Sequence, residues 1–493
     1  MRILCPRRGR SRQVRSLSLG SAIFLASPFV ACGVALADPT LPTIGSTVYN
    51  LTVSNSNIDN GVTIGTGASA STNAAVINAA ITYASANGGG TVEIPSSAGA
   101  YLTTAITLKS NVNLQVDTGA TLQNSATTST FITTSGTTHD IEISGGGILD
   151  NHATTTSSNN MISLQHITNL WVRNVTIENA SHEHLVPEAD TNVTLDNVNI
   201  NDAYTLSKKG GVYLSNTDGI DYSGSNFLIE NCNVSDGDDN IVAKPGSTAC
   251  SNITIKNCTI GAGHGISVGG QTNLGLNGMT VTNCTFNGTQ NGFRLKAGTP
   301  NGGVVQNVSF SNCTMTNVIQ PIIINSWYNG QDHYGSQELT PSAYNEVSNP
   351  GDPTLTVDQT NNTAAYPFFD NISYSNITVN GTGGGDPCVL IYGLNSIPAN
   401  ATNQPARNID TVTFSNVNIL NAAYGADIYY VSNLNISGLN ITAQNGNSEY
   451  LYGDSLVAVP EPASGVLALG ALAGMALRRP RKRRSQAGPP PPA

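Results

Sequence analysis

Four polar clusters follow one another in the chain: Asn216-Thr217-Asp218, Gly237-Asp238-Asp239, Gly263-His264-Gly265 and Arg294-Leu295-Lys296. From Asp218 to Asp239, then to His264 and then to Arg294, the spacings are 21, 25 and 30 residues. Spacings of this size are typical of single coils in a solenoid. Residues one coil apart share a face and lie about 5 Å apart. The stretch therefore predicts that three carboxylates, one imidazole and two cations gather in one patch, as an acid/base site with its own anion-binding pair.

A short strand-like pattern with asparagine near its middle recurs outside this stretch. Leu-Trp-Val-Arg-Asn-Val-Thr-Ile at 170–177 resembles Val-Thr-Leu-Asp-Asn-Val-Asn-Ile at 193–200, and most intervals between copies are 22 to 34 residues. Further copies centre on Asn231-Cys232, Asn257-Cys258, Asn283-Cys284, Asn312-Cys313, Asn376-Ile377 and Asn416-Val417. Each copy alternates apolar and polar residues, as strands do. Because no copy can bury its apolar face alone, the repeat predicts an all-β solenoid, specifically a parallel β-helix.

The repeated Asn and Cys positions predict two stacked columns. The asparagines can form a hydrogen-bonded ladder at a turn. The cysteines can stack in the core, either as small buried hydrophobes, which we favour, or as a series of disulfides. No CxxC motif is present, so the sequence does not indicate a zinc site.

Two regions interrupt the period. Residues 72–83 predict a short helix with a Thr or Asn cap, which we expect to cover the first coil. Residues 327–366 are rich in Tyr, Pro, Asn and Gly and predict a loop on the binding face, with a plain surface insertion as the alternative.

The N-terminal segment, residues 1–37, predicts a signal peptide. Six arginines accompany an apolar run over 17–36, which ends near the small-residue site Ala35-Leu36-Ala37. An uncleaved membrane anchor is the alternative. Residues 38–458 would then form the catalytic domain.

The C-terminal segment predicts a second targeting signal, in addition to the signal peptide. Val459-Pro460-Glu461-Pro462 leads into an apolar run over 463–477 and a basic cluster over 478–484, followed by a Pro-rich tail over 485–493. This order resembles the PEP-CTERM sorting signal of Gram-negative bacteria, which implies transient contact with membrane sorting machinery and processing at the cell surface. The added tail departs from that pattern, and a plain membrane anchor is the alternative.

Without both ends the protein is strongly acidic. Twelve of the 21 Lys and Arg residues lie in the two end segments, which leaves nine cations against 30 acids and a formal charge of −21. A charge of this sign excludes nucleic acid as a partner.

The four clusters resemble the four motifs of glycoside hydrolase family 28, the polygalacturonases, and occur in the family's order. Similarity extends over residues 60–440 and includes Gly88-Gly89-Gly90-Thr91-Val92 and Gly145-Gly146-Gly147-Ile148-Leu149-Asp150. The resemblance implies a right-handed parallel β-helix that hydrolyses α-1,4-galacturonosyl linkages of pectin with inversion. It also implies a pectic substrate, no cofactor or metal, and secretion or display at the cell surface. We expect the protein to be a monomer. The alternatives are a non-catalytic polysaccharide-binding surface protein and a calcium-dependent pectate lyase using Asp218, Asp238 and Asp239 as ligands.

By this resemblance Asp238 is the general acid, and Asp218 and Asp239 bind and activate water. Glycoside hydrolysis needs such an acid and such a carboxylate. Three crowded carboxylates cannot all ionise cheaply, so one should stay protonated. Asp238 and Asp239 would point to opposite faces of a regular strand, so we expect the backbone to bend near Gly237. Inverting pairs usually stand roughly 6.5–9.5 Å apart, more than the spacing of neighbouring coils.

The remaining candidates would bind the substrate or adjust the pKa of a catalytic carboxylate. His264 can hydrogen-bond a catalytic carboxylate and tune its pKa. Arg294 and Lys296 alternate by two, face the same way and suit a substrate carboxylate. The further binding candidates are Asn216, Lys244, His184 and, by resemblance, Tyr328. Two departures from the family pattern are Asn240, where many relatives carry cysteine, and Gly269-Gly270, where serine is common.

Overall fold

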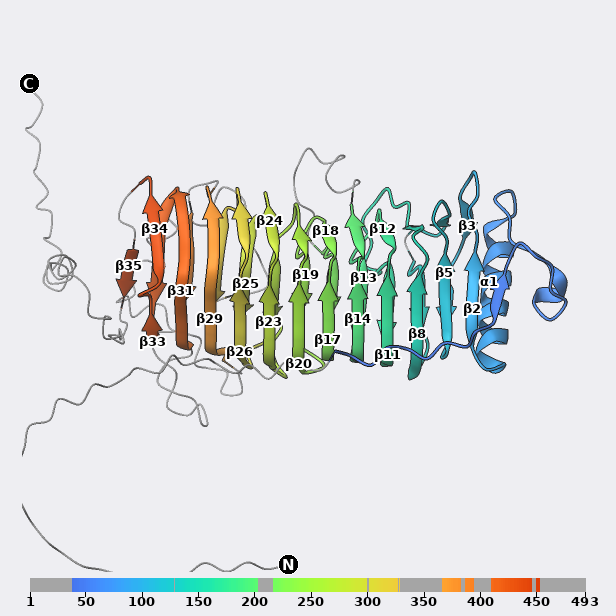
Figure 1. The fold of residues 1–493 in the computed structure, drawn as a ribbon, viewed down its shortest axis with the longest axis horizontal. Helices are drawn as coiled ribbons and strands as arrows, with labels where there is room; N and C mark the ends of the chain where they lie inside the picture. The colour runs from blue at the N-terminus through green and yellow to red at the C-terminus, as the bar shows by residue number, and fades with distance from the viewer. Residues whose placement is uncertain are drawn as a thin grey trace, which may run out of the picture. The chain divides into compact units, whose positions relative to one another are not determined.

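The structure is a computed structural model, which describes residues 38–127, 129–202, 216–298, 301–326, 328, 366–382, 386–393, 409–445 and 449–452. The chain divides into two units, Met1–Ala37 and Asp38–Ala493, and every described residue belongs to the second. That unit is a right-handed parallel β-helix, as predicted, with its strands stacked in successive coils (Figure 1). No helix among the described residues is long and apolar enough to cross a membrane.

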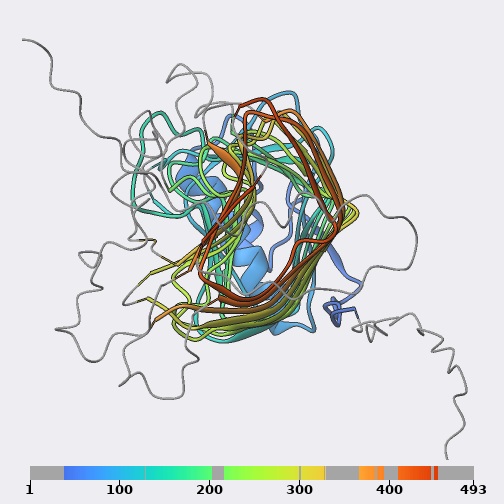
Figure 2. The same cartoon turned by 90° about the vertical axis from the view of Figure 1, so that its left-hand side faces the viewer.

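Each regular coil contributes three strands. In one coil β17 (Gly224–Glu230), β18 (Asn233–Ser235) and β19 (Ile241–Ala243) follow one another, and each pairs in parallel with its counterpart in the next coil. Among the described residues, the third strand of each coil belongs to a twelve-stranded sheet, and the others form a larger sheet of 23 strands. Viewed along the stack, successive coils superimpose around a common interior (Figure 2).

The strands of the larger sheet have the following bounds: β1 Val48–Asn50, β2 Gly90–Ile94, β3 Tyr101–Thr103, β5 Val112–Val116, β6 Thr121–Asn124, β8 Thr138–Ser144, β9 Ile148–Asp150, β11 Ile167–Arg173, β12 Thr176–Glu178, β14 Asp190–Asp196, β15 Asn199–Asn201, β17, β18, β20 Cys250–Lys256, β21 Thr259–Ile260, β23 Leu276–Thr282, β24 Thr285–Asn287, β26 Val304–Ser311, β27 Thr314–Thr316, β29 Phe368–Asn380, β31 Ile409–Ala422, β33 Val431–Asn435 and β34 Leu439–Ala443. The twelve-stranded sheet contains β4 Ile106–Leu108, β7 Ile132–Thr134, β10 Ile162–Gln165, β13 Leu185–Glu188, β16 Ile220–Tyr222, β19, β22 Ile266–Gly270, β25 Asn291–Ala297, β28 Gln320–Asn325, β30 Pro387–Tyr392, β32 Tyr424–Tyr429 and β35 Glu449–Tyr452.

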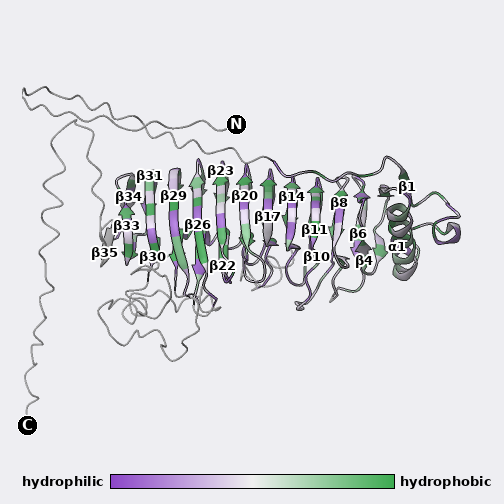
Figure 3. Cartoon of the chain, turned by 90° about the horizontal axis from the view of Figure 1, so that it is seen from below, coloured by the Kyte–Doolittle hydropathy of each residue, from purple (hydrophilic) through white to green (hydrophobic). Residues whose placement is uncertain are grey.

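Because of the strand register, one column of side chains in the twelve-stranded sheet faces the interior of the β-helix and the next column faces outward. Ile220, Ile241, Ile266 and Phe293 pair in order and are buried in the core. The neighbouring column, one residue further along each strand, reads Asp221, Val242, Ser267, Arg294. The alternation of hydropathy along the strands is visible in Figure 3. This second column, polar except at Val242, lies on the outer face of the sheet.

Aromatic rings fill the interior towards the C-terminal coils. Phe293, Phe310, Tyr374 and Phe414 stack in sequence, with ring centroids 4.2, 5.2 and 5.1 Å apart. Burial of each such side chain contributes about 1.5–3 kcal/mol. This stack supports the coils that carry the cationic pair.

The predicted asparagine ladder is confirmed. Asn197 donates to Asn174 at 2.9 Å, and Asn416 donates to Asn376 at 2.9 Å, each from the Nδ2 amide to the Oδ1 of the preceding coil. The ladder asparagines have φ between 52° and 57°, a region that asparagine tolerates better than most residues. The ladder is interrupted at two positions, where Asn231 donates to Asp196 and Asn312 donates to Thr282. A second ladder, which the sequence pattern did not predict, runs through Asn169, Asn192 and Asn226.

The cysteine column also lies where it was predicted. The six cysteines among the described residues are buried and free, so the hydrophobe interpretation holds and the disulfide alternative does not. In the column, each thiol approaches the carbonyl oxygen two residues earlier, at 3.2 Å for Cys232 and 3.1 Å for Cys313.

The predicted capping helix, α1, spans Ala70–Ala86, longer at both ends than the expected 72–83. Its N-cap is Ser69, whose hydroxyl accepts from the Thr72 N–H at 3.1 Å, so the predicted Thr or Asn cap was wrong. Val76, Ile77, Ala80 and Ile81 are buried against the first coils, and α1 covers that end of the stack (Figure 1). A short 3₁₀ helix, η1 (Asp59–Gly61), precedes it.

The predicted loop over 327–366 lies outside the described residues except at 328 and 366. The predicted signal peptide and C-terminal segments lie outside them entirely.

Candidate active site

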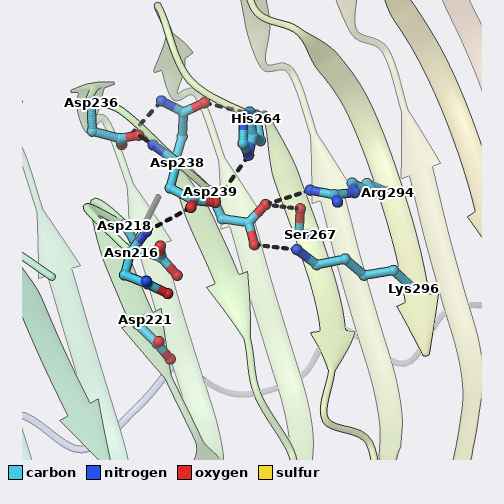
Figure 4. Close-up of polar contacts among 12 residues, drawn as sticks. Asn216, Asp218, Asp221, Asp236, Asp238, Asp239, His264, Ser267, Arg294 and Lys296 are labelled. Carbon is cyan, nitrogen blue, oxygen red and sulfur yellow. Dashed lines mark hydrogen bonds and ion pairs between the residues drawn. The ribbon is translucent and has the colours of Figure 1, made fainter. Parts of the chain in front are cut away.

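Four neighbouring strands of the twelve-stranded sheet bring the predicted residues together. Asp218 precedes β16, Asp238 and Asp239 precede β19, His264 precedes β22, and Arg294 and Lys296 belong to β25. These strands pair in the order β16, β19, β22, β25. One ligand atom each of Asp238, Asp239 and His264 lies within 4.8 Å of the others. The side chains converge on one patch (Figure 4).

Asp239 is the most tightly held carboxylate of the patch. Its oxygens accept from Ser267 Oγ at 2.7 Å, Arg294 Nη1 at 3.2 Å and Lys296 Nζ at 2.7 Å. Burial alone would raise the pKa of Asp239, but the charges of Lys296, Arg294 and His264 outweigh it and lower that pKa. Asp239 therefore stays ionised.

Asp238 forms a separate pair with His264. The His264 Nδ1 lies 2.9 Å from Asp238 Oδ1, and the backbone N–H of Asn216 donates to Asp238 Oδ2 at 2.7 Å. Burial opposes ionisation of Asp238, yet the hydrogen bond and charge of His264 lower its pKa below the ordinary value. Asp238, with a side chain 15% exposed, is more open than Asp239.

A bend at residues 236–240 lets both neighbouring aspartates serve one patch. Asp236 Oδ1 accepts from the Asp238 N–H at 3.1 Å, and Asp236 Oδ2 accepts from Asn240 Nδ2 at 3.1 Å. Asn240 Oδ1 in turn accepts from the Gly265 N–H at 2.8 Å. Burial raises the pKa of Asp236 well above its ordinary value. The predicted bend is therefore present, and it is fixed by Asp236 and by Asn240, the residue that departs from the family's cysteine.

The glycine at 263 is required by this bend. A Cβ on Gly263 would lie 2.3 Å from the Asn240 amide, and its φ is +131°. His264 thus enters the patch from a backbone position that allows close approach.

Asp218 is the carboxylate whose ionisation is opposed. It is 2% exposed, and its Oδ2 accepts from Lys244 Nζ at 2.8 Å. Burial raises the pKa of Asp218 to about 7, helped by Asp238, Asp239 and Glu183, while Lys244 acts in the opposite direction. Of the three carboxyls, Asp218 is thus the one that holds its proton to the highest pH, whereas the resemblance makes Asp238 the acid.

A buried histidine supports the backbone at Asp218. His184 Nδ1 lies 3.0 Å from the Asp218 carbonyl oxygen, and His184 Nε2 lies 3.5 Å from Asp202 Oδ2. Both side chains are fully buried. His184 is therefore a support beneath the patch and is not placed to touch a ligand directly.

The predicted substrate cations are already engaged within the patch. Arg294 and Lys296 face the same way, as predicted, and both contact Asp239. The Tyr328 ring lies beside them, 4.9 Å from Lys296 Nζ and 5.7 Å from the Arg294 guanidinium. A Cβ on Gly270 would lie 2.1 Å from the Tyr328 ring, so the glycine found where serine is common makes room for this aromatic.

Among the described residues, two groups of side chains have donor atoms close enough for a cation: Asp238 with Asp239 and His264, and Glu183 with Asp218 and Asp221. In both groups a protonated nitrogen already contacts the carboxylates, from Lys296 in the first and from Lys244 in the second. A divalent ion would have to displace these cations, which disfavours the calcium-ligand arrangement of a lyase.

Sequence reasoning missed four acidic or polar members of the site: Glu183, Asp221, Asp236 and Ser267. Asp221 and Ser267 share the outward column of Arg294, so strand parity counted from Arg294 could have found both. Glu183 and Asp236 lie outside strands, where parity gives no signal.

The chain belongs to a family defined by this fold and motif set. The model of the glycosyl hydrolases family 28 matches residues 88–347, more than half of the chain. The chain is therefore a member of family 28.

Individual relatives match over shorter stretches. A probable polygalacturonase of Arabidopsis thaliana is 33% identical over 135 residues, which cover 27% of this chain and 29% of that protein. An endo-polygalacturonase of Pectobacterium parmentieri is 26% identical over 190 residues, covering 38% and 45%. The matched regions span less than half the length of these curated relatives.

Solved structures share the fold. A family 28 exopolygalacturonase of Yersinia enterocolitica aligns with a TM-score of 0.62 at 16% identity, covering 85% of this chain and 79% of that one. The polygalacturonase of Erwinia carotovora aligns with a TM-score of 0.55 at 22% identity, covering 78% and 96%.

Proposed function

We propose that this protein is a secreted hydrolase of α-1,4-galacturonosyl linkages in pectin or polygalacturonate. The observation that carries the proposal is the patch itself, in which Asp218, Asp238 and Asp239 meet His264 and a cationic pair on one face. Family membership and the names of the matched relatives support the same substrate class.

The Asp238–His264 pair supplies the proton in this proposal. The two groups share one proton across a 2.9 Å hydrogen bond, and because the pKa of Asp238 is lowered, that proton rests on the imidazole. As the glycosidic bond breaks, the proton moves from the His264 imidazolium to Asp238 and from Asp238 to the leaving oxygen, so that Asp238 ends as a carboxylate and His264 as a neutral imidazole. Asp238 is thus the group that touches the leaving oxygen.

Asp218 accepts the proton of the attacking water. The water oxygen forms the new bond to the anomeric carbon, and its proton moves to the Asp218 carboxylate. Asp239, held by Ser267, Arg294 and Lys296, stays ionised and orients the water. The net change is one water added across one glycosidic bond.

Inversion rests on the family resemblance. The nearest oxygens of Asp238 and Asp239 lie within 4.8 Å, closer than the roughly 6.5–9.5 Å usual between the carboxyl groups of inverting pairs. A water activated mainly by Asp218 fits the proposal better than one held between Asp238 and Asp239.

Substrate recognition is proposed to use Arg294, Lys296, Tyr328 and Asn216. A galacturonate carboxylate would share the two cations with Asp239, and the Tyr328 ring beside them would pack against the sugar. Endo and exo action differ in product size, so product sizing on polygalacturonate separates them.

The experiment that tests the function is digestion of polygalacturonate in the presence of a chelator. We expect new reducing ends and no ultraviolet absorbance from an unsaturated sugar. Activity lost to the chelator and restored by calcium, with an absorbing product, would make the protein a lyase.

We also propose that residues 1–37 are removed on export, that 38–458 form the catalytic domain, and that 459–484 direct display on a Gram-negative cell surface. Mass spectrometry of the exported protein tests this processing, since a surface form that retains Arg484 would contradict it.

A further inference from the structure

Lys244 is the centre of an ion cluster beside the three aspartates. It follows β19 directly, and its Nζ lies 2.8 Å from Asp218 Oδ2, 2.5 Å from Asp221 Oδ2 and 3.4 Å from Glu183 Oε1. The Lys244 side chain is 29% exposed, whereas those of Asp218 and Asp221 are 3% and 9% exposed. The ammonium thus lies against two nearly buried carboxylates.

The Lys244 ammonium has as many carboxylate partners as it has hydrogen-bond donors. An ammonium has three N–H donors, and three carboxylates lie around this one. Lys244 therefore has no donor left over for a substrate carboxylate unless it gives up one of these bonds. This geometry argues against the substrate-binding role predicted from the sequence.

Asp218 shares the ammonium of Lys244 with Glu183 and Asp221. Asp239 has Arg294 and Lys296, and Asp238 has His264. Within the described part of the chain, Lys244 is the cation in direct contact with Asp218.

The groups that face Asp218 come from four segments. Glu183 and His184 precede β13, Asp221 lies on β16, and Lys244 follows β19. Asp236, Asp238 and Asp239 precede β19, and His264, which faces Asp238, precedes β22. Of the groups facing Asp218, the acids oppose its ionisation and Lys244 favours it.

We propose that Lys244 is a positioning residue, which holds the Asp218 carboxylate in place and keeps it ionised against Glu183, Asp221, Asp238 and Asp239. This inference rests on the proposed function, in which Asp218 accepts the proton of water. Lys244 touches neither the sugar nor the water in this role. The raised pKa of Asp218, about 7, is what remains after Lys244 has lowered it.

The test is the pH dependence of kcat/KM in Lys244→Met, which keeps the stem and removes the charge. An opposite charge at this distance shifts a carboxyl by about 1–3 pH units. We expect the acidic limb to move upward by at least one unit, with activity recovering at higher pH. Lys244→Arg should restore the limb, because it restores the charge.

Lys256→Met is the matched control. Lys256 pairs with Glu230 at 3.1 Å on the larger sheet, and its side chain is 31% exposed, close to that of Lys244. Its removal should leave the limb where it is in the wild type. An upward shift in this control as large as in Lys244→Met would overturn the proposal.

Glu183→Gln gives a test of opposite sign. It removes a negative charge that opposes ionisation of Asp218, so the acidic limb should move downward. It serves also if Lys244→Met does not fold. An unmoved limb in Glu183→Gln would contradict the cluster as described.

A substrate-binding role gives a different result. If Lys244→Met raises KM for polygalacturonate while its acidic limb stays in place, Lys244 binds substrate and the proposal is wrong.

A measurement without substrate distinguishes a failure of the proposed function from a failure of the proposed role of Lys244. Carbon-13 titration of labelled aspartate carboxyls follows Asp218, whose signal is the one absent from Asp218→Asn. We expect its midpoint to rise in Lys244→Met. A wild type inactive on polygalacturonate with this rise present rejects the function alone, whereas an unmoved midpoint rejects the role of Lys244.

Discussion

Three carboxylates of one patch differ in ionisation because their partners differ. Asp239 has a hydroxyl and two cations, Asp238 has an imidazole, and Asp218 has one ammonium that it shares. The result is a lowered pKa for Asp239 and Asp238 and a pKa of about 7 for Asp218. Environments that separate the pKa values of neighbouring carboxyls are those that divide acid from base.

The first prediction is the direction of the pH profile. kcat/KM reports the groups of the free protein, and the proposed base Asp218 is protonated below about pH 7. We expect kcat/KM on polygalacturonate to fall as the pH falls through about 7. A fall as the pH rises through that value would make Asp218 the acid and reverse the roles of Asp218 and Asp238.

The second prediction concerns the proton donor. Asp238→Asn should fold and bind normally but lower kcat by about 10²-fold or more, the scale of lost general acid catalysis. Asp196→Asn on β14 of the larger sheet is the control for losing one acidic charge. Near-normal turnover of purified Asp238→Asn would remove Asp238 from this role.

At the scale of elements, the repeat predicted the coils, the asparagine ladder and the cysteine column because these depend on strand parity and stacking alone. Parity failed where the chain bends, since the Asp236 and Asn240 bonds turn the backbone between Asp238 and Asp239. The carboxylate partners of Lys244, Arg294 and Lys296 could not be predicted from the sequence either. Spacing showed that these cations reach the patch, but only the contacts show which carboxylate each one engages.

The third prediction concerns Asp190, a buried acid at the start of β14. Its Oδ1 accepts from the Ile167 N–H at 2.6 Å, and burial raises its pKa to about 8. Between about pH 4 and 8 the folded protein keeps a proton that the unfolded chain has released. The free energy of unfolding therefore falls as pH rises through this window, by about 1.4 kcal/mol per pH unit for this group.

Asp190→Asn keeps an oxygen acceptor for Ile167 and cannot ionise. Denaturant unfolding at several pH values should show the variant gaining stability over the wild type from about pH 4 to pH 8, with a constant difference above. A difference that does not change with pH would contradict the raised pKa of Asp190.

At the scale of the whole molecule, charge opposes the proposed substrate. The segment between the two end regions has nine cations and 30 acids, and polygalacturonate is a polyanion. Binding must therefore rely on local cations such as Arg294 and Lys296 against a repulsive field.

The fourth prediction follows from this field. Raising the ionic strength from low values should increase kcat/KM on polygalacturonate, because salt screens the long-range repulsion. Highly methyl-esterified pectin, which keeps few carboxylates, is the matched control and should show a smaller change. A steep loss of activity on polygalacturonate with added salt would show that attraction dominates instead.

The central claim is inverting hydrolysis of galacturonan by the carboxylate patch, and proton NMR of freshly digested polygalacturonate tests it most directly. The spectrum of the first products identifies the anomer formed before mutarotation. We predict that saturated reducing ends appear first as the β-anomer, since water attacks opposite the α-linked leaving group. First products in the α form, or products with an unsaturated sugar, would contradict the account.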